Sequence, residues 1–254
     1  MVNSIDLSGR HAVITGAASG VGVAALHRFL DSGATVSAWD FDRARLDGIV
    51  SPEIADRVDT YLVDVSDWES VKAAAEQTHS AHGKIDILVN SAGMSVGKAP
   101  VQDYDLGHWD REIAVNLTGV FYGCKAVFPY MLAGGYGRVV NFSSMAAKSG
   151  AKNQSGYVAA KGALIALTKS LGFETAGTGV LVNCLCPGVM DTPFYRSWRD
   201  GQSPEVIERA TSTIPLGRVA SAEEAAGTLA WMVSEDMSYT TGYTFDLSGG
   251  RAAF

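Results

Sequence analysis

Short runs of β-branched and apolar residues alternate along the chain with longer segments in which apolar side chains recur every three or four residues. This alternation is typical of strand–helix–strand units that build a parallel sheet. Strands are expected at Arg10–Thr15, Thr35–Trp39, Val58–Leu62, Ile85–Asn90, Gly137–Ser143, Val180–Cys186 and Thr244–Leu247. Helices are expected at Gly20–Ser32, Asp67–His82, Trp109–Leu132, Gln154–Thr175 and Ala222–Val233. Several strands are almost wholly apolar, which indicates a sheet covered on both faces.

The pattern therefore predicts an α/β protein with a single-domain Rossmann fold over residues 1–254, in which a doubly wound, seven-stranded parallel sheet carries helices on both faces. One segment, Gly188–Thr213, shows neither the strand pattern nor the helical period, and it contains Pro193 and Pro204. A stretch of that length without regular structure inside a compact domain is usually functional. We interpret residues 188–213 as a substrate lid.

Charge and hydropathy narrow the range of partners. The chain has 20 basic and 27 acidic side chains, so its net charge is −7. This balance offers no basic surface for nucleic acid or for an anionic membrane. No apolar run approaches the roughly 20 residues of a membrane span, and MVNSIDLSGR lacks the layout of a signal peptide. We expect a cytoplasmic protein that binds neither membrane nor nucleic acid.

The cysteines and histidines do not form a metal-binding pattern. Three cysteines, at positions 124, 184 and 186, are too few for a disulfide framework, and we interpret them as buried packing thiols. The five histidines, at positions 11, 27, 79, 82 and 108, are scattered, and we interpret them as surface or turn residues. No metal is predicted.

A glycine-rich turn follows the first strand. Gly16, Gly20 and Gly22 allow the chain to turn tightly, admit a pyrophosphate to the backbone and start a helix whose N-terminus attracts phosphate. The next strand ends about 20 residues later at Asp40, whose carboxylate can accept hydrogen bonds from both adenosine ribose hydroxyls. The same carboxylate repels a 2′-phosphate, so the sequence favours NAD over NADP. Arg43 is the alternative, since it could reach such a phosphate.

With these motifs, the chain resembles the classical short-chain dehydrogenase/reductase family over nearly its whole length. The family's motifs occur in order, and they are the glycine turn, Asn90-Ser91-Ala92-Gly93 with Ser91 in place of the second Asn, Asn116, Ser144, Tyr157 with Lys161, and Pro187-Gly188 with Thr192. The resemblance implies a cofactor site made by Gly16, Ser19, Gly20, Val21, Gly22, Asp40, Asp64, Val65, Asn90, Ala92, Gly93, Tyr157, Lys161, Pro187, Gly188, Val189 and Thr192. In it, Asp64 and Val65 flank the adenine, and the Val189 backbone holds the nicotinamide carboxamide. The resemblance also implies a homotetramer.

The chemistry of the implied catalytic residues follows from their types and spacing. Tyr157 and Lys161 are four residues apart on a predicted helix, so the ammonium can lie near the phenol. A positive charge there is expected to lower the pKa of Tyr157 and make it the acid/base for alcohol oxidation. Ser144 is expected to bind the substrate oxygen; Ser143 is its neighbour, but the family's spacing selects Ser144. The resemblance gives Lys161 a contact with the nicotinamide ribose, and Asn116 a water that relays protons.

Substrate contacts are expected from Ser144, Tyr157, Met145, Gln154 and the lid arginines Arg196 and Arg199. Polar and basic groups around an apolar cleft favour a sugar, a polyol or a sugar acid. The sequence thus predicts an NAD-dependent oxidoreductase that interconverts a secondary alcohol and a ketone. Two alternatives stay open, a 3-ketoacyl thioester reductase, which Asp40 disfavours, and a noncatalytic dinucleotide-binding sensor, which would not need the four catalytic residues.

Overall fold

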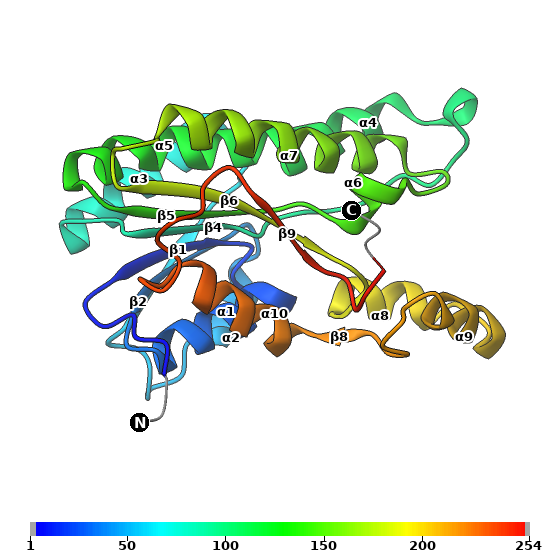
Figure 1. Ribbon diagram of the computed structural model, residues 1–254, viewed down its shortest axis with the longest axis horizontal. Helices are drawn as coiled ribbons and strands as arrows, with labels where there is room; N and C mark the ends of the chain where they lie inside the picture. Colours follow the sequence, from blue (N-terminus) through cyan, green and yellow to red (C-terminus); the bar gives the residue numbers. More distant parts are fainter. Residues whose placement is uncertain (1–3, 252–254) are drawn as a thin grey trace.

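A computed structural model describes residues 4–251 and has a seven-stranded parallel sheet at its centre (Figure 1). The strand order is β3-β2-β1-β4-β5-β6-β9, and every pair in it is parallel. The strands are β1 (His11–Thr15), β2 (Thr35–Asp40), β3 (Val58–Leu62), β4 (Ile87–Asn90), β5 (Gly137–Phe142), β6 (Val180–Pro187) and β9 (Thr244–Leu247). The predicted doubly wound Rossmann fold is confirmed, with strand ends that differ from the prediction by at most two residues.

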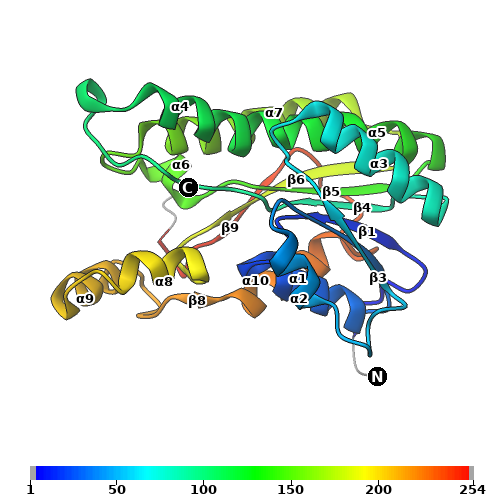
Figure 2. The ribbon, with the colours of Figure 1, turned by 180° about the vertical axis from the view of Figure 1, so that it is seen from behind.

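Helices form a layer on each face of the sheet. One face carries α3 (Trp68–His82), α4 (Leu106–Ile113), α5 (Gly119–Gly134) and α7 (Ser155–Glu174), and the other carries α1 (Gly20–Asp31), α2 (Arg43–Ile49) and α10 (Ala222–Met232) (Figures 1 and 2). In β1, Ile14 packs in the core on the α1 side and Val13 in the core on the α3 side. Both faces of the strand are buried, which explains the apolar residues Ala12, Val13 and Ile14 at its centre.

The order of the strands reverses between β1 and β4, because the chain builds outward from β1 in one direction and then crosses to the other. In doubly wound sheets, ligands bind beside the carboxyl ends of the strands at such a reversal. Here Thr15, the last residue of β1, accepts hydrogen bonds at its Oγ1 from the backbone N–H groups of Ser91 and Ala92, both at 3.1 Å. The threonine therefore fixes the turn after β4 at the edge of the crevice.

Several elements were absent from the sequence prediction. They are α2, the short helix α6 (Met145–Ser149), a 3₁₀ turn at Val101–Asp103, and a two-stranded ladder of β7 (Met190–Asp191) and β8 (Ala220–Ser221). The predicted lid is also not irregular, because it contains α8 (Pro193–Arg199) and α9 (Pro204–Ser212). Each of these two helices starts with proline, which is favoured at the first helical position, and each is too short to show a clear apolar period.

The expected helix Trp109–Leu132 has an internal irregularity. It is divided into α4, a π-helical turn at Ala114–Thr118 and α5. The cause is local, since Asn116 donates from its side-chain Nδ2 to the carbonyl of Glu112 at 3.0 Å. Single π-turns within α-helices occur frequently at functional sites.

The histidines include one that was misjudged from sequence. His11 is fully buried at the start of β1, and its ring stacks on that of His82 with 3.7 Å between centroids. The expectation of a surface residue is wrong because β1 is a central strand. The three cysteines are buried, as expected. Within residues 4–251, no cluster of three potential metal ligands occurs and no helix is long and apolar enough to cross a membrane.

Candidate active site

The glycine turn has the backbone geometry that a dinucleotide requires. Gly16 and Gly20 have φ of +67° and +52°, in the left-handed region that favours glycine. A Cβ on Gly22 would lie 2.0 Å from the Gly16 carbonyl oxygen, so only glycine fits where the helix approaches the turn. Ser19 precedes α1 without a side-chain capping bond, and Val21 lies in its buried first turn. The first N–H groups of α1 thus point toward the crevice, where a pyrophosphate would bind.

Asp40 lies beside this turn at the end of β2. Its carboxylate accepts hydrogen bonds from the backbone N–H groups of Ala18, at 3.0 Å, and Asp42, at 3.1 Å. These bonds hold the carboxylate in place while leaving oxygen lone pairs for a ribose. Arg43 points elsewhere, with its guanidinium 3.9 Å from the Asp47 carboxylate on the exposed side of α2. The local charges therefore fit the adenosine of NAD and offer nothing to a 2′-phosphate.

The turn after β3 holds the residues expected to flank the adenine. Asp64 accepts at Oδ1 from the backbone N–H and hydroxyl of Ser66, and Val65 packs against α5, where a Cβ on Gly119 would come within 2.9 Å of it. The Asp64 carboxylate is thus engaged in its own turn. It lies at the rim of the crevice, where its backbone can border an adenine ring.

The side chain of Asn90, the last residue of β4, points away from the crevice. Its side chain is buried beneath α5, where Nδ2 donates to Asn141 Oδ1 at 2.9 Å. A Cβ on Gly123 would lie 2.6 Å from its Oδ1. This side chain points to the helical layer and joins β4 to β5, so a contact of Asn90 with the cofactor would have to come from its backbone.

The following residues, Ala92 and Gly93, do reach the crevice. A Cβ on Gly93 would lie 3.0 Å from Asn116 Oδ1 and 3.2 Å from Lys161 Nζ, so glycine allows both polar groups to approach the backbone. Asn116 is fully buried, and its amide is bonded to both backbone groups of Met94, donating to the carbonyl at 2.7 Å and accepting from the N–H at 3.0 Å. The π-turn thus brings Asn116 to the loop after β4.

Ser144 and Tyr157 both line a single pocket, and the neighbouring Ser143 does not. Ser144 caps α6, with its Oγ accepting from the Ala146 N–H at 3.1 Å. The Ser143 hydroxyl is buried and donates to the Lys161 carbonyl at 2.6 Å. The choice of Ser144 as the serine that can meet a substrate agrees with this geometry.

Lys161 is buried one turn of α7 below Tyr157. Its Nζ donates to the Phe142 carbonyl at 2.8 Å and lies 5.9 Å from the centroid of the Tyr157 ring. Burial lowers the pKa of Lys161 to about 8. Burial also raises the pKa of Tyr157, opposed by its hydrogen bond with Ser144 and reinforced by the charge of Glu112. The expected lowering of the Tyr157 pKa by Lys161 is thus not found in this state, because desolvation of the phenol is the larger effect.

Glu112 is a site residue that the sequence analysis missed. It is fully buried, and its carboxylate accepts from the N–H groups of Val96 and Gly97, at 2.9 and 3.3 Å, and from the Tyr104 hydroxyl at 2.7 Å. A Cβ on Gly156, the residue before Tyr157, would lie 2.5 Å from Glu112 Oε2. One carboxylate therefore joins the loop after β4 to the start of α7. Its only sequence signal is an acidic residue on the apolar side of a helix.

The segment after β6 closes the cofactor end. The Gly188 N–H donates to the Leu247 carbonyl at 2.8 Å, and the Val189 carbonyl accepts from the Ala220 N–H at 3.1 Å, so residues after Pro187 run between β9 and β8. Thr192 caps α8 and lies against the glycine turn, since a Cβ on Gly20 would be 3.3 Å from its side chain. This contact brings the first residues of the predicted lid over the phosphate-binding turn.

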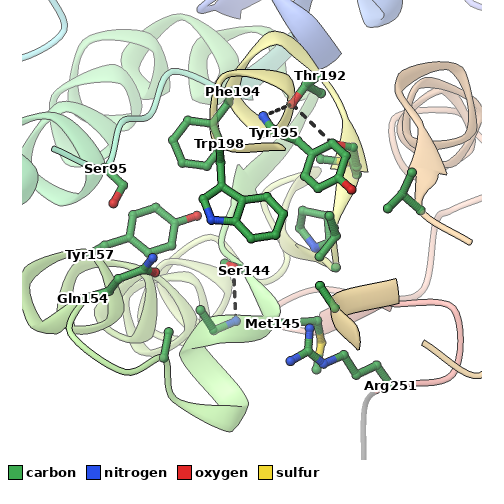
Figure 3. Close-up of a pocket in the computed structure, with 18 of the residues that line it drawn as sticks. Ser95, Ser144, Met145, Gln154, Tyr157, Thr192, Phe194, Tyr195, Trp198 and Arg251 are labelled. Carbon is green, nitrogen blue, oxygen red and sulfur yellow. Dashed lines mark hydrogen bonds between the residues drawn. The ribbon is translucent and has the colours of Figure 1, made fainter. Parts of the chain in front are cut away.

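A pocket of about 610 Å³ opens beside Ser144 and Tyr157 (Figure 3). Met145 and Gln154 line it from α6 and the start of α7, and Phe194, Tyr195 and Trp198 line it from α8. In Figure 3 the Trp198 indole lies between the phenol of Tyr157 and the ring of Tyr195. The aromatic residues of the predicted lid thus cover the site that the catalytic candidates open into.

The lid arginines do not contribute to this pocket. Arg196 forms a bidentate ion pair with Asp191 at 2.8 and 3.0 Å, and Arg199 pairs with Asp200 at 2.9 Å. Both guanidinium groups are exposed, and neither residue lines the cavity. The expectation that they contact substrate is wrong, because α8 turns its aromatic side inward and both arginines toward nearby carboxylates.

Comparisons with known proteins agree with this architecture. A family model described as enoyl-(acyl carrier protein) reductase matches residues 16–252. The chain is 41% identical, over 247 residues covering 97% of each sequence, to the 2-dehydro-3-deoxy-L-rhamnonate dehydrogenase (NAD(+)) of Sphingomonas sp.. It is 37% identical to the 3-oxoacyl-[acyl-carrier-protein] reductase of Thermotoga maritima, with 96% of this chain and 98% of that protein covered. The solved NAD⁺-bound xylitol dehydrogenase superimposes with a TM-score of 0.90 at 31% identity, over 96% of this chain and 99% of the other. The chain belongs to the short-chain dehydrogenase/reductase family of oxidoreductases.

Proposed function

We propose that this protein is an NAD-dependent dehydrogenase that interconverts a secondary alcohol and a ketone on a sugar, a polyol or a sugar acid. The observation that carries the proposal is the convergence of Ser144 and Tyr157 on one pocket, next to a crevice whose glycine turn and Asp40 fit NAD. The relatives named for a sugar-acid dehydrogenase and a xylitol dehydrogenase support the substrate class.

The cofactor contacts are assigned to the residues that border the crevice. Gly16, Ser19, Gly20, Val21 and Gly22 receive the pyrophosphate, and Asp40 binds the adenosine ribose. The backbones of Asp64, Val65, Ala92 and Gly93 border the adenine and its ribose, while Pro187, Gly188, Val189 and Thr192 hold the nicotinamide end. When bound, the nicotinamide supplies the hydride chemistry, and the protein supplies position, a proton acceptor and electrostatics.

Each catalytic side chain has a defined task in oxidation. Ser144 holds the substrate hydroxyl, and the Tyr157 phenolate oxygen takes the hydroxyl proton as the carbinol hydrogen leaves as hydride. In reduction Tyr157 gives the proton back to the carbonyl oxygen. Lys161 contributes positive charge near the phenol and a contact for the nicotinamide ribose. Asn116 anchors the path by which protons exchange with solvent.

The raised pKa of Tyr157 predicts how the rates of oxidation and reduction depend on pH. A phenol with a raised pKa stays protonated at neutral pH, which suits it as the proton donor in ketone reduction. Oxidation needs the phenolate, so its rate should rise with pH through the alkaline range, while the reduction rate should fall there.

The test is a comparison of Tyr157→Phe with the wild-type enzyme. The variant should bind NADH normally but lose at least about a hundredfold in kcat, since general acid–base catalysis typically contributes that much. Lys161→Ala should weaken both NADH binding and turnover. A Tyr157→Phe enzyme with nearly normal kcat would exclude the mechanism.

A ketoacyl thioester reductase remains the second candidate, because the Thermotoga maritima relative carries that name. Acetoacetyl-CoA reduction assayed with NADH and NADPH separates the two functions. The proposed dehydrogenase should show little activity there and should prefer NADH, because Asp40 disfavours NADPH. A noncatalytic sensor would leave the convergence of Asn116, Ser144, Tyr157 and Lys161 without a purpose.

We further propose that residues 188–213 act as a lid of a single-domain enzyme. Within this segment, α8 contributes Phe194, Tyr195 and Trp198 to the pocket, and α9 contributes Ala210 and Thr211. Closure over substrate would exclude water from the phenol. Hydrogen exchange should show α8 and α9 more protected when NAD and substrate are bound.

We also propose that the protein is a cytoplasmic homotetramer, and exposed aromatic side chains support the assembly. Phe173 on α7 is 86% exposed and Phe121 on α5 is 43% exposed, and near β9 Tyr239 and Tyr243 are also exposed. Exposed aromatic side chains of this size favour burial against symmetry-related copies.

A further inference from the structure

The pocket beside Ser144 and Tyr157 has an unusual charge for this protein. The chain as a whole is acidic, with 27 acidic against 20 basic side chains. Yet none of the residues that line the pocket is Asp or Glu, whereas Lys98 and Arg251 both line it. The positive charges at this cavity therefore favour a negatively charged ligand, whereas the acidic surface of the molecule as a whole disfavours one.

Arg251 is held at the pocket by the segment that follows β9. Gly249 and Gly250 have φ of +63° and +89°, so the chain reverses there in a conformation that glycine allows. The Gly249 carbonyl accepts from the Leu216 N–H at 3.1 Å, and a Cβ on Gly249 would lie 2.7 Å from Ile214. The turn is therefore packed against the end of the lid, and it places Arg251, an exposed residue, among those that line the pocket.

The Arg251 guanidinium is not neutralised within residues 4–251. No ion pair or side-chain hydrogen bond joins it to any of them, whereas Arg196 and Arg199 each pair with an aspartate. In Figure 3 its side chain lies at the edge of the residues drawn and extends toward Met145. A guanidinium in this position can present its paired N–H donors to a carboxylate.

The opposite side of the pocket offers neutral hydrogen-bonding groups. Ser95 lines it from the loop that Glu112 and Asn116 hold, and the Ser95 hydroxyl is buried without a partner in the described part of the chain. The Gln154 side chain also lines the pocket and does not cap α7. Buried polar groups of this kind normally have partners, which substrate hydroxyls would provide.

We propose that the substrate is a polyhydroxylated carboxylate whose acid group is bound by Arg251, with Lys98 adding positive charge and with Ser95 and Gln154 binding substrate hydroxyls. This inference rests on the proposed dehydrogenase function and narrows it from sugars, polyols and sugar acids to the acids. It also assigns the role that the sequence had suggested for Arg196 and Arg199 to a residue near the C-terminus.

The experiment compares aldonates of four to six carbons with the matching alditols, for example D-gluconate with D-glucitol. For each pair we measure kcat and KM with NAD⁺, and binding to the enzyme–NADH complex by calorimetry. The wild-type enzyme should prefer the acids. Arg251→Gln should raise the acid-to-alditol ratio of KM by about tenfold to a hundredfold, as expected for the loss of a hydrogen bond to a charged group.

The matched control is Arg209→Gln, which removes one positive charge from the exposed side of α9. It should leave the ratio as in the wild type, so a change confined to Arg251→Gln identifies a contact and not a general field. Arg251→Lys should restore part of the preference, because it keeps the charge but not the bidentate geometry.

The outcomes separate this inference from the function on which it rests. If alditols are oxidised and the acid-to-alditol ratio of KM in Arg251→Gln equals that of the wild type, the dehydrogenase function stands and the carboxylate site is excluded. If aldonates bind preferentially and lose that preference in Arg251→Gln, but none is oxidised, the anion site stands and the reaction is wrong. If aldonates bind no better than alditols to the wild-type complex, the inference is wrong.

Discussion

His11 should make the protein sensitive to mild acid. Its ring nitrogens are bonded to Thr35 Oγ1 at 2.8 Å and to Ser37 Oγ at 3.0 Å, and its ring stacks on His82. The pKa of His11 is lowered to about 3, mainly by burial and then by the charges of His82 and Lys84, while Asp59 acts in the opposite direction. His11 therefore stays neutral in the folded protein at pH values where a free histidine takes up a proton.

The sign and size of the effect follow from the two pKa values. The unfolded chain, with a histidine pKa of 6.5, binds more protons than the folded chain between pH 6.5 and 3, so stability falls as the pH decreases through this range. At pH 5 the pH is about 1.5 units below the histidine pKa of the unfolded chain and still above the pKa of His11 in the folded chain. At roughly 1.4 kcal/mol per unit, protonation of the unfolded chain lowers the free energy of unfolding by about 2 kcal/mol. Above pH 7 the contribution disappears.

The assay is urea unfolding at pH 7 and pH 5, at fixed protein concentration because assembly changes apparent stability. The measured quantity is the difference in unfolding free energy between the two pH values. His11→Gln cannot be protonated, so its difference should be about 2 kcal/mol smaller than that of the wild type. His27→Gln, at an exposed position of α1, is the matched control and should behave as the wild type. Equal pH dependence in His11→Gln and wild type would refute the reasoning.

Three further substitutions test the site and the assembly. Asp40→Ala should narrow the preference for NAD over NADP by about tenfold or more in kcat/KM, since it removes both ribose hydrogen bonds and the repulsion of a 2′-phosphate; an unchanged ratio would contradict the assignment. Glu112→Gln should move the pH profile of oxidation toward lower pH, because it removes a charge that raises the Tyr157 pKa; a loss of activity without any shift would indicate a purely structural role. Phe173→Glu should break the proposed tetramer into smaller species in light scattering, and a wild-type protein that is monomeric at micromolar concentration would refute the assembly.

Sequence reasoning succeeded where the determining interactions are local. Val13 and Ile14 pack into two different cores, so the centre of β1 is apolar on both faces, and that signal needs no knowledge of the partners. The four-residue spacing of Tyr157 and Lys161 places both on one helical face whatever the rest of the fold does. The glycine turn and Asp40 are likewise encoded in one strand–helix–strand unit.

Sequence reasoning failed where a polar side chain could bind more than one group and only the fold decides which. Arg196 and Arg199 lie in the segment predicted to cover the substrate, but nearby aspartates pair with both of them. The sequence also did not show that the Asn90 side chain would point to the helical layer, which the pleat of β4 decides. The short helices α8 and α9 went unnoticed because fewer than three turns do not establish a period.

The amino-acid sequence by itself determined the order of the elements, the type of the sheet and the residues able to perform the chemistry, because these depend on periodicity and on short spacings along the chain. Only the tertiary structure decided which polar groups share the pocket. Ser95, Glu112 and Arg251 reach the surroundings of Tyr157 from segments that are up to about 150 residues apart in the chain. The order of strands in the sheet and the turn at Gly249 and Gly250 bring them together, and no local pattern encodes contacts over that separation.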